Sequence, residues 1–205
     1  MRYKCPIARS VPQSEFLDAA RQVFSAHGYS GATVERIADA AGVSRVTLHR
    51  RGISKDGLLS ELVAAATEDY QQRLWPALTA TGSAAGRLVQ ALESLCAMAE
   101  EHMGLLTALR EQSDGVFHED GEEALTRNVF TEPFERLLCD GVDDGTLQVT
   151  DPEETATVLF NLVGWSYIHL RRGHGWSPER ASRAVIEPLL HGLLAKDAAL
   201  AGASR

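Results

Sequence analysis

Apolar residues recur every three or four positions along most of this chain, and no stretch alternates with the period of two that marks a strand. Pro76 is expected to end the helix before it, and the charged stretch 113–123 is expected to be a loop. The pattern predicts an all-α fold, with helices at about residues 34–41, 44–50, 58–75, 88–103 and 105–109, one ending near 139, and two more at 152–172 and 178–195.

One segment near the N-terminus carries the most specific pattern. Thr33 and Ser44 are expected to cap two short helices through their hydroxyls, because such oxygens accept bonds from free backbone N–H groups. Gly42, between the two helices, is expected to adopt the left-handed conformation that ends a helix. The spacing of three residues is that of a helix-turn-helix: a small residue, Ala38, is followed by Gly42 four positions later and by Leu48 ten positions after Ala38. In this motif two helices cross closely.

The outward face of the second short helix carries groups that suit DNA. Guanidinium groups pair with guanine edges or phosphates, hydroxyls bind phosphates, and methyl groups contact thymine. An ordinary solvated helix face is the alternative, but turn, caps and basic face coincide here, which favours DNA binding. The residues expected to contact DNA are Thr33, Ser44, Arg45, Val46, Thr47, His49, Arg50, Arg51 and Lys55.

Residues 14–62 resemble the DNA-binding domain of the TetR family of bacterial transcriptional regulators. The resemblance rests on a first helix like FLDAARQVFSAHGY, the block IADAAGVSRVTLHR and the helix start SKDGL. It implies that the face just described contacts DNA and that Lys55 lies against a phosphate, as the start of a helix also favours. Gly52 replaces an aromatic residue of the family pattern, with Ile53 filling part of its space, and is expected to loosen the second short helix.

The charge distribution supports a DNA-binding end. The whole chain is acidic, with a net charge of −8. Residues 1–55, however, hold nine Lys and Arg against four Asp and Glu, whereas the remaining residues hold 11 against 24. A basic end on an acidic body is expected where one end of a protein meets phosphates.

The same patterns divide the chain into functional segments. The N-terminal segment, with Arg2, Lys4 and Arg9, either adds affinity by entering a minor groove or is a disordered terminus, and both interpretations stay open. The predicted segments are a basic flexible arm at 1–13, a helix-turn-helix domain at 14–57, a connecting helix at 58–75, a helical ligand-binding and dimerisation domain at 76–198, and a tail at 199–205.

The last two predicted helices are expected to form a homodimer interface. Asp151-Pro152 and Ser177-Pro178 are strong helix starts. The first of these helices is apolar on nearly all sides. A partner subunit is therefore expected to cover one side of this helix. Relatives in the TetR family dimerise in this way, and a two-fold dimer fits a palindromic operator. The expected interface residues are Leu159, Leu162, Val163, Ser166, Leu170, Val185, Leu189 and Leu193.

A small-molecule effector site is the second expectation for the C-terminal domain. Aromatic walls with a few polar groups are the usual composition of such a site. A ligand that prefers one arrangement of the dimer would shift its population and so release DNA. For Asn161, Trp165 and His169 the alternative is that they bond to one another or across the dimer. The expected pocket residues are Met98, His102, Arg110, Phe130, Phe134, Asn161 and Trp165.

Other functions find little support in the sequence. There is no glycine-rich phosphate loop, metal-ligand spacing or nucleophile motif, so no enzyme activity, metal or cofactor is expected. No apolar run approaches the ~20 residues that span a bilayer, and three scattered cysteines fit a reducing cytoplasm, with Cys96 and Cys139 expected in the core. The prediction is a cytoplasmic, dimeric, ligand-released repressor. A constitutive DNA-binding regulator without effector and, less favoured, a small helical enzyme are the alternatives.

Overall fold

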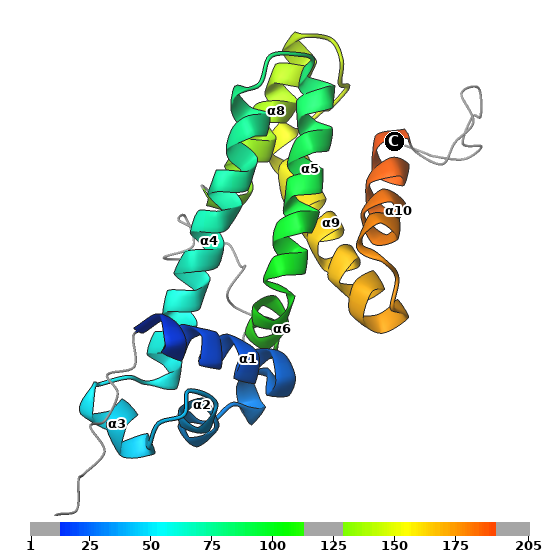
Figure 1. Cartoon of the computed structure of the whole chain (residues 1–205). Helices are drawn as coiled ribbons and strands as arrows, with labels where there is room; N and C mark the ends of the chain where they lie inside the picture. Colours follow the sequence, from blue (N-terminus) through cyan, green and yellow to red (C-terminus); the bar gives the residue numbers. More distant parts are fainter. Residues whose placement is uncertain (1–12, 113–128, 192–205) are drawn as a thin grey trace, which may run out of the picture. The chain divides into compact units, whose positions relative to one another are not determined.

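The computed structural model describes residues 13–112 and 129–191, which form two compact units (Figure 1). The head unit comprises residues 13–71 and 101–112, and the body unit comprises residues 72–100 and 129–191. All regular structure in these ranges is helical, as the hydrophobic pattern predicts. The helices are α1 (Gln13–Gly31), α2 (Val34–Ala40), α3 (Arg45–Arg50), α4 (Lys55–Thr79), α5 (Ala84–Glu101), α6 (Met103–Gln112), α8 (Glu132–Asp143), α9 (Pro152–His174) and α10 (Pro178–His191).

The head unit is built around α1, which packs on α2 and runs beside α6 (Figure 1). Gly104 of α6 lies so close to α1 that an added Cβ would stand 2.5 Å from the Cβ of Ser25. Residues 101–112, which the sequence assigns to the C-terminal domain, therefore group with the helix-turn-helix. The core of the head unit is formed by Phe16, Ala19, Ala20, Val23, Phe24, Ala32, Ile37, Ala38, Leu48, Leu58, Leu59, Leu62, Ala66, Leu105, Ala108 and Leu109.

The body unit packs α9 against both α8 and α10. Polar contacts between distant parts of the chain join its helices. The Asp144 carboxylate accepts a hydrogen bond from the backbone N–H of Ala84 at 2.7 Å and so caps the start of α5. The Glu100 carboxylate accepts bonds from Arg171 (Nε, 2.7 Å) and from the Tyr167 hydroxyl (2.8 Å). These contacts tie α5 to α9 and to the loop after α8.

Several predicted helix boundaries are wrong. α4 does not end before Pro76 but continues to Thr79, because the carbonyls of its last turn are still bonded: Ala80 N–H donates to Pro76 O at 2.9 Å. Pro76 donates no hydrogen bond to the preceding turn, but the helix continues past it to Thr79. The helix predicted at 88–103 begins four residues earlier and ends at Glu101, so Met103 belongs to α6.

α8 also departs from the prediction, running to Asp143 rather than to about residue 139. Cys139, expected in the core, is exposed, whereas Cys96 is buried. α10 extends at least to His191, and the predicted loop 113–123 and the tail lie outside the described residues. Within the described ranges, no helix is both long enough and apolar enough to cross a bilayer.

Candidate nucleic-acid interface

Helices α2 and α3 meet at the turn that the sequence predicts. Thr33 caps α2 by accepting from Arg36 N–H at 3.3 Å, and Ser44 caps α3 by accepting from Thr47 N–H at 3.3 Å. Gly42 has φ +67°. The N–H of Gly42 donates to Asp39 O, and that of Val43 to Ala38 O at 2.9 Å. This bond pair is a Schellman motif, which ends a helix with a left-handed glycine.

The end of α3 repeats this geometry at Gly52. Gly52 has φ +68°; its N–H donates to His49 O at 3.0 Å, and the N–H of Ile53 donates to Leu48 O at 3.1 Å. Ile53 packs against the core of the head unit. The expectation that Gly52 loosens the helix is therefore wrong: as the C-terminal cap of a Schellman motif it fixes the end of α3.

α3 buries one side and exposes the other. Leu48 is fully buried in the head core, whereas Val46 is 64% exposed and Arg45, His49 and Arg50 are also exposed. Val46 is thus an exposed apolar side chain beside basic groups on a helix of six residues. Such a side chain is suited to contact thymine methyl groups in a DNA groove. The remaining predicted contacts, Thr33 and Ser44, are exposed, and Thr47 is half-buried with its hydroxyl 3.0 Å from that of Ser44.

Three of the predicted basic contacts already have partners in the head unit. The Arg45 guanidinium lies 2.7 Å from the Glu35 carboxylate. The Arg51 guanidinium stands 5.2 Å from the centre of the Phe16 ring. Sequence reasoning did not identify Glu35, because an acidic residue in the first turn of a helix is expected from the helix dipole alone.

The third, Lys55, is the first residue of α4 and is held by Tyr29. Its Nζ donates to the Tyr29 carbonyl at 3.2 Å and stands 3.8 Å from the centre of the Tyr29 ring. The Tyr29 hydroxyl in turn donates to the Asp56 carboxylate, and the Tyr29 ring stacks on Phe24. The ammonium has three N–H donors, so it keeps donors for a phosphate at this position.

The predicted effector-pocket residues divide between the two units. His102 and Arg110 belong to the head unit. In the body unit, Met98 and Phe134 are buried, Phe130 and Trp165 are half-buried, and Asn161 donates to the Thr157 carbonyl of its own helix at 2.9 Å. Phe130 packs against Phe160, which is not among the predicted pocket residues, with ring centres 5.5 Å apart.

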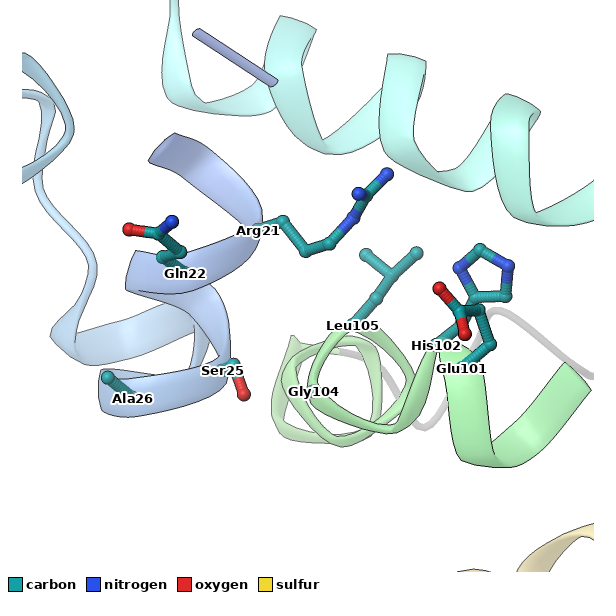
Figure 2. A pocket seen from close by; sticks show the side chains of 8 residues that line it. All are labelled: Arg21, Gln22, Ser25, Ala26, Glu101, His102, Gly104 and Leu105. Atoms are coloured by element: carbon teal, nitrogen blue, oxygen red, sulfur yellow. The ribbon is translucent and has the colours of Figure 1, made fainter. Parts of the chain in front are cut away.

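His102 lines a cavity of about 410 Å³ within the head unit (Figure 2). Figure 2 shows Arg21 and Ser25 of α1 on one side of it and His102 and Leu105 on the other. His102 is 8% exposed, and its Nε2 lies 2.9 Å from the Asp69 carboxylate of α4. Among the predicted pocket residues, His102 alone lines this cavity.

The predicted dimer residues are partly used inside the single chain. Val163 is fully buried, and Leu159 and Val185 are buried to 8% and 9% exposure. Leu162 is 46% exposed, as is its neighbour along the helix, Val158, at 51%. α9 thus buries one side in its own unit and leaves an apolar stripe uncovered. Ser166, Leu170 and Leu189 are half-buried, and Leu193 lies outside the described residues.

Two further predictions concern the rest of the site. The basic arm, residues 1–13, lies outside the described residues except for Gln13. No cluster of three or more His, Cys, Asp or Glu side chains that could hold a metal ion occurs in residues 13–112 and 129–191.

The geometry defines a helix-turn-helix protein, and comparison with known proteins agrees. Residues 16–62 match the family model of bacterial regulatory proteins, tetR family. A segment of 100 residues is 34% identical to the HTH-type transcriptional repressor AcnR of Corynebacterium diphtheriae; it covers 49% of this chain and 48% of that protein. The match thus spans about half of the relative's length.

Solved structures of such regulators share the fold over most of the chain. The TetR family transcriptional regulator PfmR of Thermus thermophilus superposes with a TM-score of 0.72, covering 88% of this chain and 99% of that one at 24% identity. The transcriptional regulator FadR of Bacillus subtilis, solved with stearoyl-CoA, superposes with a TM-score of 0.69. The superposition covers 89% of this chain and 100% of that one at 17% identity. Residues 16–62 are thus similar to the tetR family of bacterial regulatory proteins, and the chain shares its fold with solved regulators of this kind.

Proposed function

We propose that this protein is a cytoplasmic transcriptional regulator that reads double-stranded DNA with α3. The observation that carries the proposal is a short helix fixed at both ends by caps and glycines, with Leu48 buried beneath it and Arg45, Val46 and Arg50 facing outward. A recognition helix needs this combination, because base edges are read only by side chains held in a fixed register. The similarity to a repressor over half of its length supports repression as the regulatory outcome.

Selection of bound sequences from random double-stranded DNA tests the proposal, followed by affinity measurements on the selected duplex. Replacing Arg50 with Ala is expected to weaken binding by about 10-fold or more, since a lost base or phosphate contact costs roughly 1–3 kcal/mol. Arg183→Ala, an exposed arginine of the body unit, is the matched control and is expected to change affinity little. A chain that enriches no sequence does not have the proposed function.

The regulator is proposed to act as a homodimer on a palindromic operator. Val158 and Leu162 support this, since two exposed large apolar side chains one helical turn apart favour a covering partner. Leu162→Glu is expected to shift the protein toward monomer in sedimentation experiments and to abolish binding to a two-half-site operator. Arg172→Glu on the same helix is the charge control. A wild-type monomer that binds a full operator tightly would contradict the dimer.

A small-molecule effector is proposed to change DNA binding through the body unit. The similar fold of FadR, which was solved with stearoyl-CoA, makes acyl-CoA esters the first compounds to titrate into the protein–DNA complex. Trp165→Ala is expected to keep DNA binding and lose ligand release. A complex that responds to no metabolite would favour the alternative, a constitutive regulator.

A further inference from the structure

Arg45 occupies the position on α3 from which a base edge is most readily reached. It is the first residue of the recognition helix, and the N-terminal residues of such helices contact bases in the major groove. Its side chain is 71% exposed, yet one guanidinium nitrogen, Nη1, is already bonded to Glu35 of α2 at 2.7 Å. Any DNA group that Arg45 binds must therefore lie close to the Glu35 carboxylate as well.

Glu35 is held in place as an anion. Its own backbone N–H donates to the carboxylate, which lowers the pKa of Glu35, and the positive charge of Arg45 and the Thr33 hydroxyl lower it further. The neighbouring guanidinium, that of Arg36, is turned away and donates to the Gly31 carbonyl at 2.6 Å. At neutral pH the negative charge of Glu35 therefore stands beside Arg45.

The two kinds of DNA acceptor respond differently to this charge. A phosphate on Arg45 brings a second negative charge to within a few ångströms of Glu35, and the two anions repel. The guanine edge is neutral and offers two acceptors, O6 and N7. Arginine has five N–H donors in a planar fork, so it can keep its bond to Glu35 and still donate to guanine.

We propose that Glu35 is a specificity-determining residue, which keeps Arg45 from binding backbone phosphates and reserves it for a neutral base edge. The proposal rests on the proposed function, that α3 lies in the major groove. Two like charges at this distance near a protein surface repel strongly enough to change affinity on the order of 5-fold, before screening by salt. Glu35 thus weakens non-specific binding more than specific binding.

The test compares Glu35→Gln with Asp39→Asn on two duplexes, the selected sequence and a scrambled one. Asp39 lies one turn further along α2 and is exposed, so its substitution removes an equal charge without touching the Arg45 pair. Glu35→Gln is expected to tighten binding to the scrambled duplex about 5-fold and to steepen its salt dependence by about one phosphate contact, a slope change of roughly 0.9. Binding to the selected duplex is expected to change little.

Asp39→Asn is expected to change both affinities by the same factor, so that their ratio stays as in the wild type. In an Arg45→Ala background, Glu35→Gln is expected to leave the ratio unchanged as well, because the side chain it controls is gone. Equal ratios for Glu35→Gln and Asp39→Asn, or an effect of Glu35→Gln that persists without Arg45, would overturn the proposal.

Failure of the proposed function itself gives a different result. The wild-type protein would then bind the two duplexes equally before any variant is compared. The fold is not at risk in these variants, because an exposed ion pair contributes little to stability. Unchanged circular dichroism melting of each variant checks this directly.

Discussion

The helix-turn-helix segment, residues 33–53, and the body unit fix their helices by contacts of different range. In the segment, Thr33 and Ser44 bond backbone N–H groups three residues away, and Gly42 and Gly52 close bonds of similar span. In the body unit, the partners of Ala84, Arg87 and Glu100 lie 60, 53 and 71 residues away. The first region can be read from neighbouring residues, whereas the second depends on how distant helices meet.

The largest expected effect tests whether local signals suffice to hold α3. A helix of six residues is far too short to be stable alone, so its burial on the head core must stabilise it. Leu48→Ala is therefore expected to lower the free energy of unfolding by about 2–5 kcal/mol, the range for deleting a buried leucine side chain. Val46→Ala on the exposed side is expected to cost under about 0.5 kcal/mol. Urea unfolding of both variants measures the difference, and equal costs would mean that α3 does not depend on the core.

The next effect concerns the long-range contacts of the body unit. Glu100→Gln keeps the shape of the side chain but loses the charge that receives Arg171, and is expected to cost about 2 kcal/mol, as for hydrogen bonds to charged groups. Glu93→Gln, an exposed acid on the same helix, is the control and should cost under about 0.5 kcal/mol.

The contribution of Glu100 is also expected to depend on pH. The hydrogen bond from Arg171 holds the pKa of Glu100 below its ordinary value. A carboxyl group with a lowered folded-state pKa stabilises the protein fully above its unfolded pKa, about 4.3, and loses this contribution as the pH falls through the folded value. The stability difference between wild type and Glu100→Gln should thus be full at neutral pH and shrink below about pH 4. A difference that stays at its neutral-pH value as the pH falls further below about 4 would contradict the ion pair.

A third comparison sets two glycines against each other. Gly52 has φ +68° with open space around its Cα, so Gly52→Ala is expected to cost about 1–2 kcal/mol from backbone strain alone. Gly164 lies within α9 and also faces open space, but in helical conformation, and Gly164→Ala is expected to stabilise by up to about 1 kcal/mol. Opposite signs in urea unfolding support the Schellman cap at Gly52, and a stabilising Gly52→Ala would refute it.

Features fixed by neighbouring residues can be predicted from the sequence, whereas features fixed by distant contacts cannot. The helical fold, the caps at Thr33, Ser44, Asp151 and Ser177, and the turn at Gly42 were readable, because each signal lies within a few residues of what it controls. The prediction for Gly52 is wrong because the sequence does not show at which residue α3 ends. Without that residue, a glycine within a helix cannot be distinguished from one just beyond its end. The Glu35–Arg45 and Lys55–Tyr29 contacts were missed because they depend on how helices cross. No pattern along the chain placed His102 in the head unit rather than among the pocket residues of the body unit.

The smallest expected effect sets a limit on the comparison between the two regions. Ser44 caps α3, and Ser177 caps α10 by accepting from Arg180 N–H at 3.3 Å, so each region contains the same three-residue device. Replacement by Ala is expected to cost about 1 kcal/mol at either site, measured without DNA, because a cap satisfies a backbone N–H regardless of the helix behind it. Similar losses of stability for the two variants would mean that the two regions differ in their long-range contacts and not in their helix caps. A cost near zero at Ser177 alone would instead mean that distant contacts of the body unit already fix the start of α10.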